Sequence, residues 1–195
     1  MIQRVGCHGL YVLTGLLLLS FATAAEDSVK TRHDFINHAG YRYDKLRAPT
    51  PQQVPGGITI TTEELIELID RDDPVLIDVQ AVTVRPELRE FAMDWLPSKT
   101  RYSLPDATWL PNVGYAELDT GIEDYFRNNL RRLTAGNLRT PVVIYCVLDC
   151  WLSWNAVQRA VGYGYRRVYW YRLGTDGWEA AGQPLTAVDP TPLHP

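Results

Sequence analysis

Two cysteines separated by three residues are the positions in this sequence whose type and spacing best suit chemistry. Cys146 and Cys150 lie in "YCVLDCWLSW", where an apolar run gives way to a helix-like pattern. A thiol between a strand end and a helix N-terminus tends to have a lowered pKa, because backbone N–H groups and the helix dipole favour the thiolate. We therefore predict that Cys146 is a nucleophilic or sulfur-carrying residue and that Cys150 acts with it.

The spacing of the pair also sets a condition for a disulfide. Residues four apart on a regular helix have Cβ atoms about 5 to 6 Å apart, whereas a disulfide needs about 3.8 Å. An internal bond therefore requires Cys146 to lie in a loop that precedes the helix. A strand-to-helix turn provides such a loop.

The N-terminal residues resemble an export signal. Arg4 precedes the compact apolar run "LYVLTGLLLLSF" at residues 10–21, and the small residues of "ATAA" precede Glu26. The run is shorter than the roughly 20 residues that span a bilayer. We predict a signal peptide at residues 1–25 that is cleaved on export to the periplasm and leaves no stable membrane span. Cleavage removes Cys7, the third cysteine.

Helical and strand patterns alternate after residue 58. "TTEELIELIDRDD" begins with a capping box, and "GIEDYFRNNLRRL" and the stretch after Cys150 repeat apolar residues at helical spacing. The apolar runs "PVLIDV", "PVVIYC" and "RRVYWY" between them are typical of buried strands. This order predicts an α/β fold with a mostly parallel central sheet and helices on both faces.

The remaining organisation is simple. Residues 26–57 are polar and rich in proline and glycine, which indicates an extended N-terminal arm or linker. Residues 58–187 form the predicted single domain, and residues 188–195 form a C-terminal tail. The formal net charge is -4 and no basic stripe is present, so nucleic acid is not expected as a partner.

Several segments resemble a known family. "LIDV", "VVIYC" and "GYRRVYWYRLGTDGWEAAGQPL" look like parts of a rhodanese-like domain. "LPDATWLPNVGY" together with "CVLDCWLSWNA" is similar to the CXXCW-motif proteins associated with catabolism dependent on pyrroloquinoline quinone (PQQ), although three residues separate the cysteines here. The resemblance implies a periplasmic accessory to PQQ-dependent alcohol oxidation, with the alcohol dehydrogenase or its cytochrome c as partner.

The rhodanese resemblance also implies roles for residues around the pair. Cys146 takes the place of the persulfide-forming nucleophile, and an active-site loop would hold its sulfur. The loop residues are Val147, Leu148, Asp149 and Trp151. This loop lacks the small and basic residues that usually hold an anionic donor, and a carboxylate near Cys146 would oppose the thiolate. Gln80 stands where an arginine is common, whereas Asp78 is expected to be structural. Plain thiosulfate transfer is therefore not predicted.

Three functions remain open from the sequence. The sequence also leaves open whether the protein turns over as an enzyme. The first is thiol redox or persulfide transfer, with Cys146 attacking and Cys150 resolving. The second is copper(I) carriage by the two thiolates, for which His33, His38 and Asp149 are the available third ligands. The third is a non-catalytic module that binds a quinoprotein dehydrogenase or its cytochrome, with Trp151 as the aromatic residue expected to face the partner.

Overall fold

Five parallel strands form the central sheet of the computed structural model, in the order β1, β6, β5, β2, β4. They are β1 (Ile58–Ile60), β2 (Val75–Asp78), β4 (Thr108–Trp109), β5 (Val142–Tyr145) and β6 (Val168–Tyr171). The structure describes residues 35–83 and 95–193, and the description below concerns the unit that begins at Ile36. The register pairs Asp78 of β2 with Tyr145 of β5, so the residues that follow these two strands emerge side by side.

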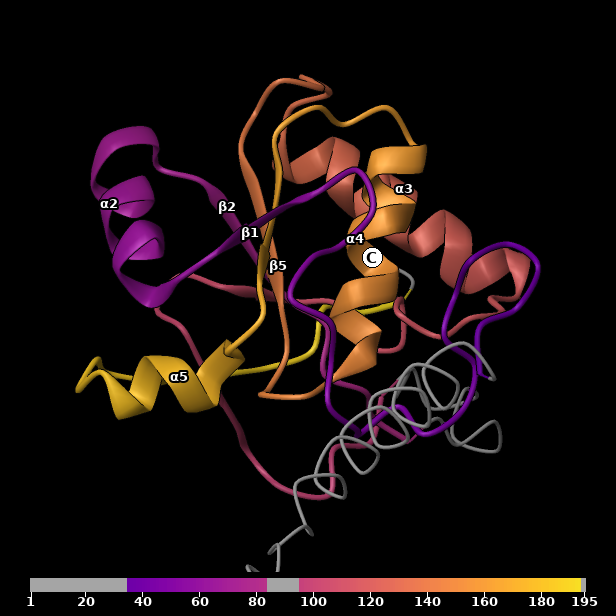
Figure 1. Ribbon diagram of the computed structural model, residues 1–195, viewed down its shortest axis with the longest axis horizontal. Helices are drawn as coiled ribbons and strands as arrows, with labels where there is room; N and C mark the ends of the chain where they lie inside the picture. Colours follow the sequence, from indigo (N-terminus) through magenta and orange to yellow (C-terminus); the bar gives the residue numbers. More distant parts are fainter. Residues whose placement is uncertain (1–34, 84–94, 194–195) are drawn as a thin grey trace, which may run out of the picture. The chain divides into compact units, whose positions relative to one another are not determined.

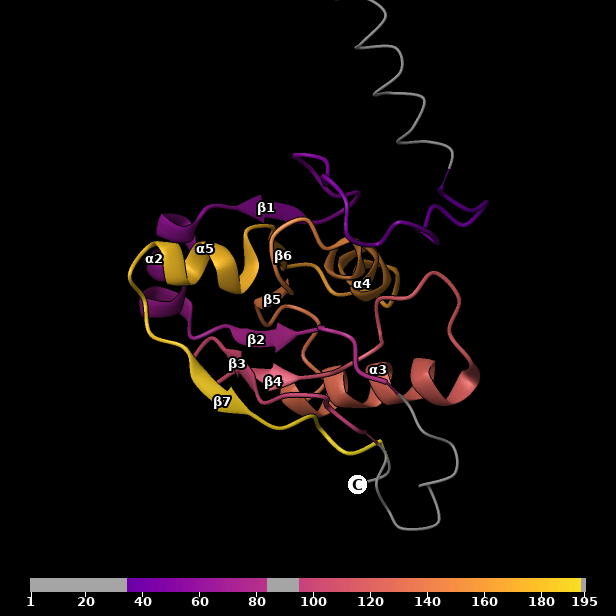
Figure 2. The same ribbon diagram turned by 90° about the horizontal axis from the view of Figure 1, so that it is seen from below.

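Helices cover both faces of this sheet (Figure 1). The helices are α2 (Thr62–Asp72), α3 (Thr120–Leu133), α4 (Trp151–Gly162) and α5 (Gly174–Ala180). Helices α2 and α5 lie on one side of the strands, and α3 and α4 lie on the other (Figure 2). The predicted fold class, a mostly parallel sheet between two helical layers, is confirmed.

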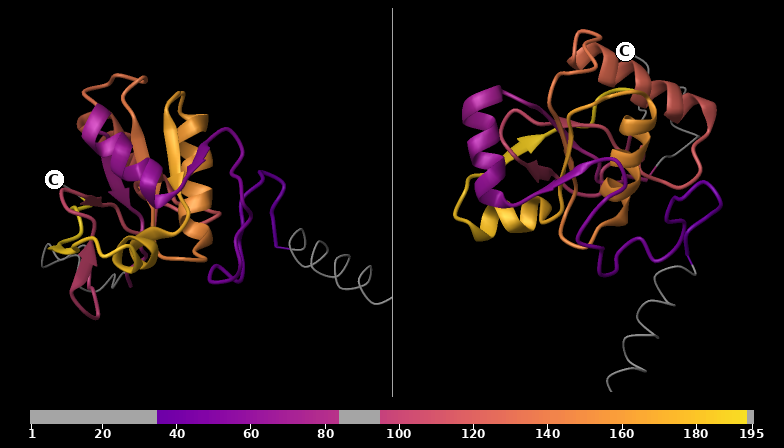
Figure 3. Two further views of the ribbon diagram at one scale, coloured as in Figure 1. Left: turned by 60° about the vertical axis from the view of Figure 1, so that its left-hand side comes forward. Right: turned by 45° about the horizontal axis from the view of Figure 1, so that its top comes forward.

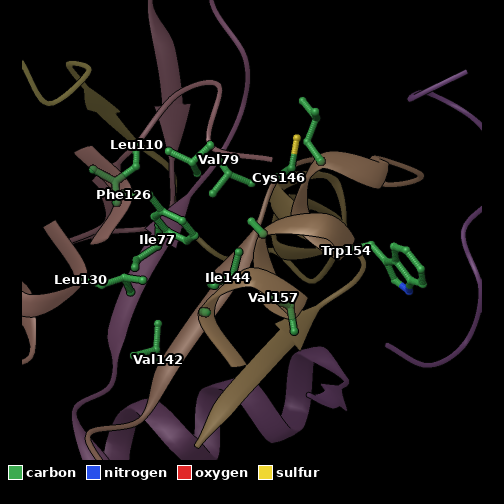
Figure 4. Close-up of a cluster of buried hydrophobic side chains, with 14 of the residues drawn as sticks. Ile77, Val79, Leu110, Phe126, Leu130, Val142, Ile144, Cys146, Trp154 and Val157 are labelled. Carbon is green, nitrogen blue, oxygen red and sulfur yellow. The ribbon is translucent and has the colours of Figure 1, made fainter. Parts of the chain in front are cut away.

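The alternation of side chains along β5 explains the two layers. Val142 and Ile144 pack against α3 and α4, in the cluster that Figure 4 shows, whereas Val143 and Tyr145 pack against α2 and α5. All four side chains are fully buried. A strand buried on both faces reads as a continuous apolar run, which is why "VVIY" was recognisable in the sequence.

The helix boundaries follow from local capping. At the start of α2 the side chain of Thr61 accepts a hydrogen bond from the N–H of Glu64, and the Glu64 carboxylate accepts one from the N–H of Thr61, so the predicted capping box is present. Asp119 caps α3 by accepting from the N–H of Ile122 at 2.9 Å. Helix α4 begins at Trp151 without a side-chain cap of this kind. Its first N–H group is instead satisfied by the carbonyl oxygen of Leu46, at 2.9 Å.

A small antiparallel pair, β3 (Arg101–Ser103) and β7 (Thr186–Val188), lies beside the main sheet. The C-terminal residues after it are also held. The carbonyl oxygen of Thr191 accepts hydrogen bonds from Trp95 Nε1 at 2.6 Å and from the Tyr125 hydroxyl at 2.8 Å. The first residues of the predicted tail therefore pack against the domain.

The segment 36–57 runs in an extended course along α4, as Figure 3 shows, and we call it the arm. The amide of Asn155 on α4 accepts from the N–H of Arg42 at 2.9 Å and donates to the Arg42 carbonyl at 2.8 Å. Farther along the arm, the carbonyl of Gln53 accepts from Trp154 Nε1 at 3.1 Å. This part of the predicted arm is therefore bound to the domain along its length. Residues 26–34 lie outside the described part of the chain.

The predicted signal peptide, residues 1–25, also lies outside the described residues. Within residues 35–83 and 95–193, none of the helices combines the length and apolar character that a bilayer crossing requires.

Candidate functional site at the cysteine pair

Cys146 follows directly after β5 and is fully buried. Its thiol donates a hydrogen bond to Oε1 of Gln80, with 3.1 Å between sulfur and oxygen. Gln80 follows β2, the neighbour of β5 in the sheet, so the parallel pairing brings the two side chains together. The sulfur of Cys146 extends from the end of the apolar cluster in Figure 4. The carboxyl edge of the sheet, where ligands bind in open α/β folds, thus carries this thiol.

Cys150 is the N-cap residue of α4 and is 3% exposed. The side chain of Cys146, together with the backbone N–H groups of Leu152, Ser153 and Val147, lowers the pKa of Cys150. Burial has the opposite effect on Cys146 and raises its pKa well above the usual value of a thiol. The structure therefore places the more stable thiolate on Cys150, and the predicted lowering of the Cys146 pKa is wrong. The amide groups of the helix end point to the second cysteine instead of the first.

The backbone around the pair meets the condition for an internal disulfide. Cys146 lies between β5 and α4, and Cys150 has the extended conformation of an N-cap residue, with φ -107° and ψ 109°. Neither cysteine occupies the helix interior, and each side chain affects the pKa of the other. Both cysteines are free thiols in this structure.

The loop residues between the cysteines are held by other parts of the chain. The N–H of Leu148 donates to the carboxylate of Asp176 on α5, at 2.9 Å. Asp149 has a left-handed backbone, with φ 55°, and its carboxylate accepts from the N–H of Thr50 in the arm, at 3.2 Å. Asp149 is thus bound to the arm. The nearby carboxylate that raises the Cys146 pKa belongs to Asp78.

Trp151 does not face solvent. It is 1% exposed, and its ring packs edge-on against that of Trp154, with 5.1 Å between ring centroids. The guanidinium of Arg42 in the arm lies 4.7 Å from the Trp151 ring. The expectation that Trp151 presents a partner-binding face is therefore wrong, since the arm and α4 bury it. The neighbouring Trp154, Trp170 and Trp178 are also buried.

A buried polar network next to Cys146 was only partly predicted. Asp78 is fully buried and accepts hydrogen bonds from Arg101 Nε at 2.8 Å, Ser103 Oγ at 2.6 Å and the N–H of Gln80 at 2.9 Å. The predicted structural role of Asp78 is thus supported by its contacts. Arg101 was missed, although its second nitrogen also lies 3.3 Å from the carbonyl oxygen of Cys146. It lies on the short strand β3, in a segment without periodicity that would mark it.

Comparison with known protein families agrees with this geometry. The family model described as "Rhodanese-like domain" matches residues 61–181, more than half of the chain. The chain belongs to the rhodanese-like domain family. The matched segment of the rhodanese-like domain contains both cysteines, whereas the arm precedes it.

Three solved structures are similar to the rhodanese-like chain. A thiosulfate sulfurtransferase from Pseudomonas aeruginosa is 23% identical, with a TM-score of 0.45 over 69% of this chain and 21% of the other. The polysulfide-sulfur transferase homodimer from Wolinella succinogenes is 15% identical, with a TM-score of 0.41 over 90% and 95% of the two chains. The human single-domain sulfurtransferase TSTD1 is 20% identical, with a TM-score of 0.40 over 63% and 95%.

The chain therefore spans about a fifth of the length of the Pseudomonas enzyme. No curated protein matches it.

A pocket of about 430 Å³ opens beside Cys146 in the rhodanese-like domain. Its lining includes Gln80 and Val147, which flank the thiol, and three cationic residues: Arg47, Lys99 and Arg101. Positions 147–149 of the loop carry no basic residue. Positive charge nevertheless reaches this region from the arm and from the segment that leads into β3.

The described residues contain no group of three or more histidine, cysteine or acidic side chains that could hold a metal ion. His38 is exposed in the arm, and His33 lies outside the described part of the chain. Asp149, the remaining third-ligand candidate, is bound to Thr50 as described above.

Proposed function

We propose that this protein is an exported rhodanese-like accessory protein whose Cys146–Cys150 pair handles sulfur by cycling between dithiol, persulfide and disulfide states. The observation that carries the proposal is the contact between the two buried side chains. The side chains of the two cysteines influence each other's pKa, and the lowered value belongs to Cys150, so an attacking thiolate and a resolving thiol lie at the two ends of one short loop.

The pKa directions favour Cys150 as the attacking sulfur, in place of the predicted Cys146. The Cys150 thiolate attacks the sulfane sulfur of a donor, R–S–SH. A bond forms between Cys150 Sγ and that sulfur, the S–S bond of the donor breaks, and the donor leaves as the thiol R–SH. The protein then carries a persulfide on Cys150.

Cys146 completes the cycle. Its thiol loses a proton and attacks Cys150 Sγ, so that the Cys146–Cys150 disulfide forms and the outer sulfur leaves with its bonding electrons as hydrosulfide. A dithiol reductant restores the starting state by thiol–disulfide exchange. Attack on an ordinary disulfide in place of a persulfide leads to the same internal bond, so sulfur handling and thiol redox use one centre.

The compartment and the partner are part of the proposal. The charged start, apolar run and small residues of the first 25 positions support export to the periplasm, where thiols are readily oxidised. The similarity of "LPDATWLPNVGY" and "CVLDCWLSWNA" to the CXXCW-motif proteins supports a role beside a PQQ-dependent alcohol dehydrogenase or its cytochrome c.

Intact mass spectrometry tests the proposal directly. Reduced protein is incubated with a polysulfide, and its free thiols are alkylated before and after reduction. We expect a Cys150→Ser variant and a Cys146→Ser variant to retain single thiols that form persulfides or mixed disulfides, whereas the unmodified pair ends as an internal disulfide. Free thiols that remain unreacted in the unmodified protein would exclude sulfur handling. If the unreacted protein retains copper(I) against a competitor, the carrier function is supported. If the protein neither reacts with the polysulfide nor retains copper(I), the non-catalytic binding module is the remaining function.

A further inference from the structure

We propose that the pocket beside Cys146 binds a small organic anion that contains the sulfur–sulfur bond to be cleaved, and that Arg47 and Lys99 bind the acidic groups of this ligand. Arg47 belongs to the arm, outside the segment that matches the rhodanese-like family. The inference rests on the proposed function, and it assigns substrate selection to residues beyond the cysteine loop.

The pocket leads to the thiol through two of its lining residues. The Gln80 side chain lines the pocket and accepts the hydrogen bond of the Cys146 thiol at 3.1 Å. Arg101 lines the pocket and contacts the Cys146 carbonyl oxygen at 3.3 Å. Glutamine has a flexible side chain, and rotation of Gln80 away from the thiol would remove the residue that lies between Cys146 and the pocket.

The charge of the pocket favours an anion. Among the residues that the structure describes, none that lines the pocket is acidic. Arg101 is neutralised by Asp78, whose carboxylate lies 2.8 Å from its Nε atom. Arg47 and Lys99, by contrast, form no salt bridge within residues 35–83 and 95–193. Two exposed cations that line one pocket, with no carboxylate among its described lining residues, can bind a ligand with two acidic groups.

The volume of the pocket favours an organic ligand over an inorganic sulfur oxoanion. Pockets that bury organic ligands begin at roughly 300 Å³, and this pocket measures about 430 Å³. Its walls also include the apolar side chains of Val82, Trp109 and Val147, which can contact a carbon skeleton. A low-molecular-weight disulfide or persulfide with carboxylate groups matches this combination of charge, size and apolar surface.

The reaction with a disulfide ligand, R–S–S–R, is balanced without a further reactant. A cysteine thiolate attacks one ligand sulfur, a mixed disulfide forms, and one R–S⁻ leaves. The second cysteine loses its proton and attacks the protein sulfur of the mixed disulfide, so that the internal disulfide forms and the second R–S⁻ leaves. The protein dithiol is oxidised by two electrons and the ligand is reduced to two thiols.

Two thiol-reactive disulfides of different charge test the proposal. Dithiobis(nitrobenzoate) carries two carboxylates, whereas dithiodipyridine is neutral, and both release a coloured thiol. We expect Arg47→Ala and Lys99→Ala each to slow the reaction with the dianion about fivefold, as one charge-assisted contact implies, and to leave the neutral reagent unaffected. Added salt should reduce the effect. Arg131→Ala, which removes an exposed cation from α3, serves as the control and should change neither rate.

Two kinetic results would overturn the proposal: unchanged rates with the dianion, or equal slowing with both reagents. Titration calorimetry of dithiobis(nitrobenzoate) into a Cys146→Ser/Cys150→Ser variant separates binding from sulfur chemistry. We expect binding that weakens when Arg47 or Lys99 is also replaced, and its absence would contradict the assigned pocket. If this binding is found while the unmodified protein forms no internal disulfide, the pocket stands and the proposed function fails.

Discussion

The guanidinium of Arg101 lies 2.8 Å from the carboxylate of Asp78, and the same guanidinium donates to the carbonyl oxygen of Cys146 at 3.3 Å. Asp78 is fully buried, so its charge depends on Arg101 and on two further hydrogen bonds. The same Arg101 lowers the pKa of Cys146, although burial and Asp78 act more strongly in the opposite direction. The ion pair therefore connects the stability of the sheet edge to the ionisation of the thiol.

Replacement of Arg101 by Met should destabilise the fold by about 3 kcal/mol at neutral pH, because it leaves a buried carboxylate without a partner. Burial raises the pKa of Asp78, and the loss of Arg101 raises it further. The folded state then binds the proton more tightly than the unfolded state. The free energy of unfolding of the variant should consequently increase as pH falls through the folded pKa of Asp78. Denaturant unfolding across the acidic range measures this.

An Asp78→Asn/Arg101→Met double variant is the control for that experiment. It removes both charges and should recover part of the lost stability, without the pH dependence. If the single variant is as stable as the unmodified protein at neutral pH, the pair does not have the structural role assigned to it.

The two thiols should lose their protons at different pH values. In a Cys146→Ser variant the new hydroxyl can donate to the Cys150 thiolate, so alkylation of Cys150 by iodoacetamide should rise at a lower pH than for an ordinary thiol. A Cys146→Ala variant removes that donor and should shift the rise to higher pH. In Cys150→Ser the remaining thiol is buried, so its rise should lie above the usual thiol range. The reverse order in rate-against-pH profiles would assign the attacking sulfur to Cys146.

Gly174 allows α5 to approach the cysteine loop. It has φ +57°, and a Cβ atom at this position would lie 2.5 Å from the carbonyl oxygen of Cys146. Gly174→Ala should therefore displace the backbone and destabilise the protein by about 2 to 3 kcal/mol, visible as a lowered Tm. Gly182→Ala is the matched control, since Gly182 has φ +73° but no atom within 4 Å of the added carbon. It should cost about 1 kcal/mol. Equal losses at the two positions would show that backbone strain alone is responsible.

Asn155 should control how firmly the arm covers α4. Its amide binds both backbone groups of Arg42, and it also donates to the carbonyl of Gly114 at 2.8 Å. Asn155→Ala leaves these buried groups unsatisfied, at a cost of about 2 kcal/mol. It should also accelerate amide hydrogen exchange within residues 42–50 and alkylation of Cys150. Gln158→Ala is the control on the same helix, because the Gln158 amide nitrogen has no hydrogen-bond partner among the described residues. Slow exchange in both variants would mean that other contacts hold the arm.

The sequence predicted the central layers well because periodicity and capping encode them locally. The three apolar runs became β2, β5 and β6, and the helices began near their capping residues. The short strands β1, β3, β4 and β7 were not predicted. Two or three residues are too few to show an alternating pattern, and their pairing partners lie far away in sequence.

Around the cysteines, the positions of the functional residues were easier to predict than the interactions that set their pKa values. The position of Cys146 after a buried strand was readable from "VVIYC". The thiol pKa values depend on which N–H groups reach which sulfur and on the buried carboxylate of Asp78, and neither is local in sequence. Arg47, Lys99 and Arg101 gave no sequence signal, because the fold alone brings them to one pocket.

The contacts of the arm also determine where the chain can be truncated for expression. A fragment that begins at Thr61, where the family match starts, would lose the Leu46 carbonyl that binds the first N–H of α4 and the Arg42 side chain that lies over Trp151. Two large indole rings, those of Trp151 and Trp154, would then face water beside a reactive thiolate. Such a fragment should aggregate and form disulfides between molecules. Expression intended for biochemistry should therefore retain the chain from at least residue 36.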